Sequence, residues 1–145
     1  MRWQLVLATA GLLISAYLTA THYFAEQVPL ACSTGGIVDC EQVTHSAESM
    51  VGPLPVAVLG VVWFAGYLLL LGARAMSARP NGLINLHMVW AVLGLASVFY
   101  LVYAELFLIG ALCLWCTGVH VIVALLFLMT LWDTTAPRAA TYEAT

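Results

Sequence analysis

The stretch that decides the fold is residues 49–73, SMVGPLPVAVLGVVWFAGYLLLLGA, which lies between Glu48 and Arg74. None of these 25 consecutive residues carries a charged side chain. A helix that crosses the hydrocarbon core of a membrane needs about 20 largely apolar residues. The stretch is therefore long enough for one membrane-spanning helix, which we expect at residues 54–74.

Three more gaps between charged residues have similar lengths and predict helices at about residues 3–25, 83–105 and 111–132. We therefore predict an all-α fold, an integral membrane four-helix bundle in a single domain of residues 1–145. A long loop at residues 26–53 joins the first two helices, and residues 134–145 form a polar tail. A cleaved signal peptide is the alternative for the first span, but its apolar stretch exceeds the usual ~7–15 residues.

The composition excludes several classes of protein. Hydrophobic residues make up 63% of the chain and charged residues only 8%, against about 25% charged in a typical globular domain. So few charges cannot coat a soluble enzyme of this length. The chain has no Lys and four separate Arg residues, which cannot form a basic groove, so we expect no nucleic-acid partner.

The basic residues predict the orientation in the membrane. All four fall on the side that holds both termini of a four-span chain: Arg2, Arg74, Arg79 and Arg138. Since basic loops stay in the cytoplasm, both termini are expected to be cytoplasmic. The loop at residues 26–53 is then extracytoplasmic. Within it, residues 38–50 favour a short helix that Asp39 caps, and Pro53 and Pro55 suit the first turn of the second long helix.

Two pairs of cysteines carry the chemical signal. Cys32 and Cys40 lie in the long loop, and Cys113 and Cys116 form a C-x-x-C motif where the fourth helix begins. All four fall on the outer, oxidising side, where disulfides persist. The positive end of a helix dipole favours the thiolate, which is the reactive form of cysteine. A redox function requires that the two pairs can meet, which Gly35 and Gly36 would help by loosening the loop.

Other interpretations of the cysteines remain open on spacing alone. The loop pair is also compatible with a structural disulfide, and the C-x-x-C pair with small apolar helix residues. Four thiolates can bind zinc, although seven intervening residues make a poor half-site, and we predict no metal site. The alternative functions are thus a non-enzymatic membrane subunit with structural disulfides and a metal-handling protein.

The arrangement resembles the vitamin K epoxide reductase family in its bacterial form. The resemblance rests on the C-x₇-C pair of the loop, Ser46 six residues after Cys40, the CLWC motif of residues 113–116 and the stretch GPLPVAVLG of residues 52–60. It covers essentially the whole chain. Another family of quinone-linked thiol oxidases also has four helices, but its C-x-x-C lies in the first outer loop, so the order of motifs here favours the first family.

The resemblance implies a membrane thiol–quinone oxidoreductase of the bacterial cytoplasmic membrane that supports disulfide bond formation. Its cofactor would be a quinone, menaquinone or ubiquinone, held inside the bundle. Its electron donor would be an extracytoplasmic thioredoxin-fold protein. Some bacterial relatives are fused to such a domain, which these 145 residues do not contain, so we expect a separate partner.

Residue roles follow from the same resemblance. Cys32 would meet the partner, Cys40 would form a transient mixed disulfide with Cys113, and Cys116 would face the quinone. Ser46 would cover or hydrogen-bond the quinone head group.

Two positions depart from the family members that reduce vitamin K epoxide. Those members have an Asn in the second helix and a Tyr four residues after the C-x-x-C, where this chain has Val56 and His120. The departures favour plain quinone reduction.

Other residues are assigned from their positions alone. His120 lies one turn beyond Cys116, where it could donate a proton or hydrogen bond to a quinone oxygen. We expect Glu105 in the headgroup region and no role for His87. Candidate walls of a quinone pocket are the aromatic residues Trp63, Trp90, Tyr100, Tyr103, Phe107 and Trp115.

Overall fold

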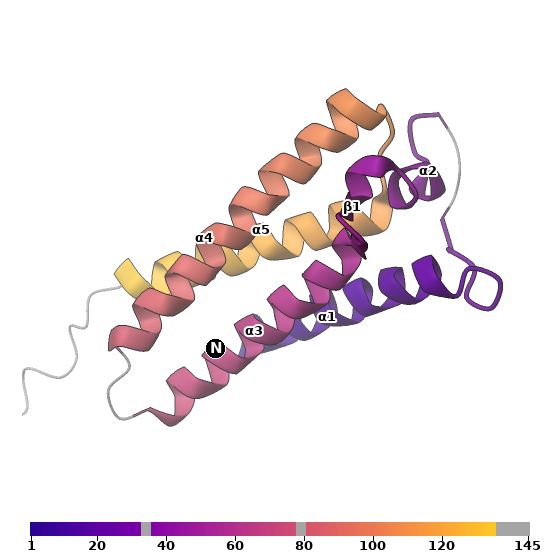
Figure 1. Ribbon diagram of the computed structural model, residues 1–145. Coiled ribbons are helices and arrows are strands. Elements are labelled where there is room, and N and C mark those ends of the chain that lie inside the picture. Colours follow the sequence, from indigo (N-terminus) through magenta and orange to yellow (C-terminus); the bar gives the residue numbers. More distant parts are fainter. Residues whose placement is uncertain (33–35, 78–80, 136–145) are drawn as a thin grey trace, which may run out of the picture.

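Four long helices dominate the computed structural model, which describes residues 1–32, 36–77 and 81–135 (Figure 1). They are α1 (Arg2–Tyr23), α3 (Val56–Met76), α4 (Asn81–Tyr103), which a π-helical turn η2 (Ala104–Ile109) continues, and α5 (Leu114–Thr135). Each long helix has 21 to 23 residues. At 1.5 Å per residue, this length crosses a hydrocarbon core of about 30 Å. The predicted all-α membrane bundle is confirmed, and the protein is a multi-pass membrane protein.

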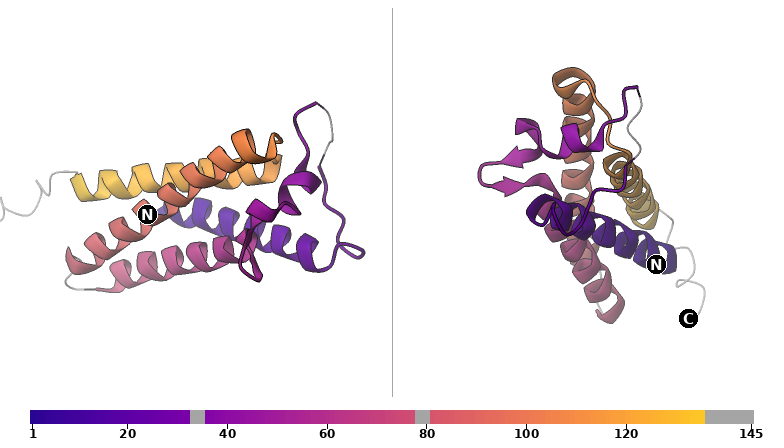
Figure 2. Two further views of the ribbon diagram at one scale, coloured as in Figure 1. Left: turned by 45° about the horizontal axis from the view of Figure 1, so that its top comes forward. Right: turned by 90° about the vertical axis from the view of Figure 1, so that its right-hand side faces the viewer.

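The four helices form a ring in which α1 packs on α3 and α5, and α4 packs on the same two helices. Because successive spans run in opposite directions, all neighbours in this ring are antiparallel. Figure 2 shows the segment between α1 and α3 gathered at one end of the bundle. We call this end, with all four cysteines, the cysteine end. The opposite end, where α1 begins and α5 ends, is the terminal end.

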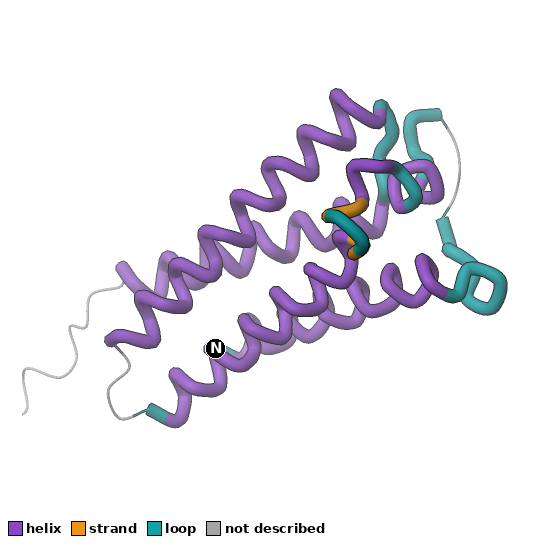
Figure 3. The backbone as a smooth tube through the Cα atoms, viewed as in Figure 1, coloured by secondary structure: helices purple, strands orange, loops and turns teal. Residues whose placement is uncertain are grey.

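In its described residues, the segment between α1 and α3 contains four short elements, which Figure 3 draws as helix and strand. They are α2 (Cys40–Thr44), the 3₁₀ turn η1 (Ala47–Ser49), β1 (Met50–Val51) and β2 (Leu54–Pro55). The carboxylate of Asp39 accepts a hydrogen bond of 2.9 Å from the backbone N–H of Gln42, so the predicted cap is confirmed. Pro55 lies just before α3 and Pro53 lies in the turn between the strands, so neither is in the first turn of the helix as expected.

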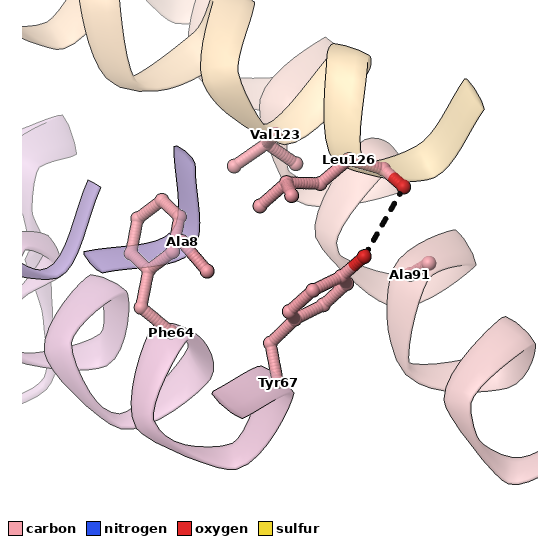
Figure 4. Close-up of a cluster of buried hydrophobic side chains, with 6 residues drawn as sticks. All are labelled: Ala8, Phe64, Tyr67, Ala91, Val123 and Leu126. Carbon is pink, nitrogen blue, oxygen red and sulfur yellow. Dashed lines mark hydrogen bonds between the residues drawn. The ribbon is translucent and has the colours of Figure 1, made fainter. Parts of the chain in front are cut away.

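Large rings on α3 fill the middle of the bundle, because the facing positions are small. Phe64 and Tyr67 are fully buried, and the cluster in Figure 4 comprises Ala8, Phe64, Tyr67, Ala91, Val123 and Leu126. The Tyr67 hydroxyl lies 3.4 Å from the Leu126 carbonyl oxygen, to which it donates. Small residues that let helices approach closely are typical of contacts between membrane helices.

Two tryptophans join α3 and α4 through a reciprocal pair of hydrogen bonds. The indole N–H of Trp63 donates to the Trp90 carbonyl at 3.0 Å, and the Trp90 indole donates to the Trp63 carbonyl at the same distance. Each ring lies against a glycine of the opposite helix. A side chain added at Gly66 would come within 2.7 Å of the Trp90 ring, and one at Gly94 would overlap the Trp63 ring.

A group of four polar side chains, which we call the polar clasp, ties the terminal end together. Gln4 of α1 and Arg74 of α3 both donate to the Asp133 carboxylate of α5, at 3.0 and 3.1 Å. Arg74 also donates to Nδ1 of His87 on α4, at 2.8 Å. His87 is completely buried. Contrary to the expectation that this residue has no role, it is the member of the clasp that binds α4 to α3.

Candidate functional site

Backbone hydrogen bonds tie the long loop to the segment that precedes α5. The N–H of Asp39 donates to the Leu112 carbonyl at 3.1 Å, and the N–H of Leu112 donates to the Ile37 carbonyl at 2.8 Å. Asp39 stands immediately before Cys40 in sequence, and Leu112 stands immediately before Cys113. The pairing therefore places Cys40, at the start of α2, beside Cys113, which immediately precedes α5.

The two cysteine pairs meet in one buried cluster. Cys40 and Cys113 are both completely buried and pack together with Val43 and Ala111. Cys40 is joined to Cys32 by a disulfide, with 6.1 Å between the Cα atoms, whereas Cys113 and Cys116 are free thiols. The loop pair is thus oxidised and the C-x-x-C pair reduced. Of the two glycines expected to loosen this loop, Gly36 adopts a positive φ of 66°, and Gly35 lies outside the described residues.

Cys113 sits where its thiolate is stabilised. The backbone N–H of Cys116 points to the Cys113 sulfur at 3.3 Å, across the first turn of α5. A hydrogen bond from the Cys116 side chain lowers the pKa of Cys113 below its ordinary value, and this outweighs the opposing effect of burial. A lowered pKa raises the fraction of reactive thiolate near neutral pH.

A cavity of about 660 Å³ opens beside Cys116. All four long helices and the elements α2, η1, β1 and β2 contribute to its lining, which is largely apolar. Its volume lies in the range of about 300–1,000 Å³ that holds small molecules and cofactors. Cys116 is on the wall of the cavity and Cys113 lies behind it, so the C-x-x-C pair connects the loop disulfide to the cavity.

Of the three residues expected near a quinone, two line the cavity and one does not. Val56, the first residue of α3, and His120, one turn after Cys116, both line the cavity. Ser46 does not appear on its wall. Its hydroxyl donates to the Val43 carbonyl at 2.9 Å and accepts from the Ser49 N–H at 3.2 Å, so it caps η1, and Ser49 lines the cavity instead.

Half of the six candidate aromatic residues line the cavity: Trp63, Trp90 and Tyr100. Tyr103 and Phe107 instead stack on each other, with ring centroids 5.2 Å apart, on the exposed face of the bundle. The Trp115 indole donates to the Ala31 carbonyl at 2.7 Å, and its ring packs against Tyr17. The expectation is therefore wrong for Tyr103, Phe107 and Trp115. The first two lie on the exposed face of the bundle, and Trp115 is hydrogen-bonded to the long loop.

Sequence reasoning misplaced Glu105. The third span is expected to end at residue 105, which would place Glu105 in the headgroup region, but the helix continues as η2 to Ile109. Glu105 is therefore one turn inside the span, almost completely buried and on the cavity wall. A carboxyl group within a membrane span marks a functional site by default, and that signal was present in the sequence.

Comparison with known protein families matches residues 2–131 to the vitamin K epoxide reductase family. This chain belongs to the vitamin K epoxide reductase family. Members are in general membrane oxidoreductases that act on thiols and use a quinone. The buried cluster of two cysteine pairs agrees with thiol chemistry. Among the described residues, no group of three or more His, Cys, Asp and Glu side chains is placed to hold a metal ion.

Proposed function

We propose that this protein is a membrane thiol–quinone oxidoreductase that supports disulfide bond formation. It passes two electrons from an extracytoplasmic thioredoxin-fold partner, through the loop pair and the C-x-x-C pair, to a membrane quinone. One observation carries the proposal: Cys113 is buried beside Cys40, while Cys116, three residues later, faces an apolar cavity. A thiol relay that ends at a lipid-soluble acceptor requires this order of sulfurs.

The electron path consists of two disulfide exchanges and one quinone step. A reduced partner attacks Cys32, leaves oxidised, and releases the loop pair as two thiols. The Cys40 thiolate then attacks Cys113 of an oxidised C-x-x-C pair, and Cys32 resolves this mixed disulfide. The Cys113–Cys116 dithiol finally gives two electrons and two protons to the quinone, which becomes a quinol, and the C-x-x-C disulfide forms again.

The cavity suits a quinone such as menaquinone or ubiquinone. Its volume and apolar lining fit a ring with an isoprenoid tail. We propose that Val56 and His120 contact the head group, with His120 hydrogen-bonded to a ring oxygen. Ser46 acts indirectly in this arrangement, by capping the turn that brings Ser49 to the cavity. An apolar Val56 supports reduction of the quinone itself rather than of an epoxide.

The proposed orientation places the cysteine end outside the bacterial cytoplasmic membrane and both termini in the cytoplasm. Arg2 and Arg74 lie near the terminal end, whereas Glu26, Glu41 and Glu48 belong to the segment at the cysteine end. Retention of basic residues on the cytoplasmic side supports this assignment. Arg79 and Arg138 lie outside the described residues.

Anaerobic quinone reduction tests the proposal. Purified protein, a reduced thioredoxin-fold donor and excess quinone are mixed, and the loss of quinone is followed by its ultraviolet absorbance. The wild type is expected to reduce the quinone, and Cys116→Ala to fall to the background rate. Leu114→Ala is the matched control, because Leu114 lies in the same motif but is exposed on the surface. No reduction by the wild type with any of several quinones and donors would refute the function.

A trapping experiment tests the order of the relay. In Cys32→Ala the resolving thiol is gone, so the mixed disulfide between Cys40 and Cys113 is expected to accumulate and to be found by mass spectrometry of peptides. A mixed disulfide between Cys40 and Cys116 instead would reverse the assigned roles of the two C-x-x-C thiols.

A further inference from the structure

The C-x-x-C pair lies close to a buried carboxyl group that the relay itself does not use. Glu105 is 4% exposed and lines the same cavity as Cys116 and His120. In the part of the chain that the structure describes, the ion pair found is Arg74–Asp133, and it lies at the opposite end of the bundle. A carboxyl group in an apolar interior without a cationic partner costs free energy, so its presence requires a reason.

The backbone around Glu105 is arranged to turn this side chain inward. The N–H of Gly110 donates to the Glu105 carbonyl at 2.9 Å, which is the five-residue spacing of a π-helix. Within η2, Ala104 and Glu105 are buried, whereas residues 106–108 are more than half exposed. Single π-helical turns are rare in proteins, and many of those that do occur are found at functional sites.

The inward carboxyl group acts on both thiols. The backbone N–H of Cys113 interacts with the Glu105 carboxyl, and the charge of Glu105 acts on Cys113 and on Cys116. The other titratable groups on the cavity wall, apart from Cys116, are His22 of α1, Glu48 of η1, Tyr100 of α4 and His120 of α5. Glu105 is the one whose charge influences both members of the C-x-x-C pair.

The proposed quinone step needs a proton carrier at this position. Two S–H bonds break, one S–S bond and two O–H bonds form, and two electrons move from the sulfurs to the quinone. The thiol protons must reach quinone oxygens across an apolar cavity. A positioned side chain that takes and gives the proton accelerates such transfers by about 10²–10⁴-fold.

We propose that Glu105 is this proton carrier. It is then a catalytic residue in addition to the four cysteines of the relay. Its carboxylate takes the proton of a C-x-x-C thiol and, as a carboxylic acid, gives it to a quinone oxygen. The group is then again a carboxylate, and it moves the second thiol proton in the same way. This inference rests on the proposed quinone reduction and adds to it the route of the protons.

The test compares Glu105→Gln with the wild-type protein in lipid nanodiscs. Glutamine keeps the size and hydrogen-bonding capacity of the side chain but cannot carry a proton. We expect kcat for quinone reduction to fall by about 10²–10⁴-fold, with the quinone KM nearly unchanged. Oxidation of the partner by the loop disulfide in a single turnover is expected to keep its rate. Glu26→Gln, the same change at an exposed loop position, is the control and is expected to be fully active.

Each outcome separates this inference from the proposed function. If the wild type reduces quinone, Cys116→Ala does not, and Glu105→Gln equals the wild type, the proton role is wrong and the relay stands. If the wild type itself reduces no quinone, the proposed function has failed first. A rise in KM at constant kcat would show that Glu105 only binds the quinone, which also overturns the proposal.

A second pair of variants covers the case in which the glutamine variant does not fold. Glu105→Asp and Glu105→Asn shorten the side chain equally and differ in whether it can carry a proton. The aspartate variant is expected to be at least about tenfold faster than the asparagine variant. Equal rates in the two folded proteins would contradict proton transfer by this residue.

Discussion

The two ends of the helix bundle use buried polar side chains in opposite ways. At the terminal end, each long helix contributes one member of the polar clasp, and the four side chains bind one another at 2.8 to 3.1 Å. At the cysteine end, Glu105 and His120 are 4% and 7% exposed, and they line a cavity of about 660 Å³. The contrast indicates that the terminal end holds the helices together, which allows the cysteine end to keep space for a ligand.

Proteins tolerate local violations of good packing mainly at functional sites and compensate for them elsewhere. Here the compensation is spatially separate. The loop disulfide, the backbone hydrogen bonds of Leu112 to the loop and the cavity lie at one end, and the charge-assisted hydrogen bonds of the polar clasp lie at the other. Variants at the terminal end should therefore change the free energy of unfolding, whereas variants at the cysteine end should change the chemistry.

The largest effect on stability is expected from Arg74→Ala. This change leaves the partly buried Asp133 carboxylate without its cation and removes the partner of His87. Breaking a fully buried pair by removing one partner costs about 3–5 kcal/mol. Because the Asp133 side chain is 28% exposed, the free energy of unfolding should fall by an amount at the lower end of this range, about 3 kcal/mol. Reversible unfolding in mixed micelles, followed by tryptophan fluorescence, measures it. Quinone reduction per folded molecule is expected to stay within severalfold of the wild type.

Two further variants control this experiment. Arg2→Ala removes an arginine that is exposed near the same end, and it should leave the free energy of unfolding nearly unchanged. The double variant Arg74→Ala, Asp133→Ala should lose less stability than the sum of its single changes, because no charge is left unpaired. Strict additivity of the two changes would show that the clasp does not couple the helices.

The sequence predicts the spans far better than the contacts between them. The gaps between charges fix four helices because the required length is set by the membrane itself. The clasp is less visible, since nothing in the sequence shows that Gln4, near one terminus, faces Asp133, near the other. The approach of Cys40 to Cys113 depends on backbone hydrogen bonds of Leu112, for which side chains give no signature.

Glu105 illustrates why the site was only partly predictable. The chemical signal was present, since a carboxyl group between two apolar stretches is unusual. Its depth was misjudged because the helix continues for another turn as η2, and a π-helical turn cannot be recognised from apolar periodicity. The cysteine motif, in contrast, was recognised because its short spacing is itself the chemical feature.

An intermediate effect is expected where the two regions join, at Gly94. A methyl group there would overlap the ring of Trp63, which is held by its hydrogen bond to the Trp90 carbonyl and cannot easily move. Overpacking of this kind costs about 1–3 kcal/mol. Because Gly94 and Trp63 also line the cavity, Gly94→Ala should lower stability and raise the quinone KM together.

Gly72→Ala is the matched control for this prediction. Gly72 lies on α3, and a side chain added there meets no atom within 4 Å. Alanine should therefore be neutral or stabilise the helix by up to about 1 kcal/mol, since it has the higher helix propensity. Equal losses of stability at Gly94 and Gly72 would mean that backbone conformation, and not the tryptophan contact, limits both positions.

The smallest effect expected is on the titration of Cys113, which reports a single hydrogen bond at the cysteine end. With the loop disulfide intact, Cys113 and Cys116 are the free thiols. The Cys116 side chain lowers the pKa of Cys113, while the charge of Glu105 opposes this. The thiolate should thus persist below pH ~8.5, where an ordinary cysteine is half ionised, and disappear as the pH falls through the lowered value. Cys116→Ala should move the midpoint of the thiolate ultraviolet absorbance upward. An unchanged midpoint would assign the lowered pKa to the backbone of α5, which the substitution leaves in place.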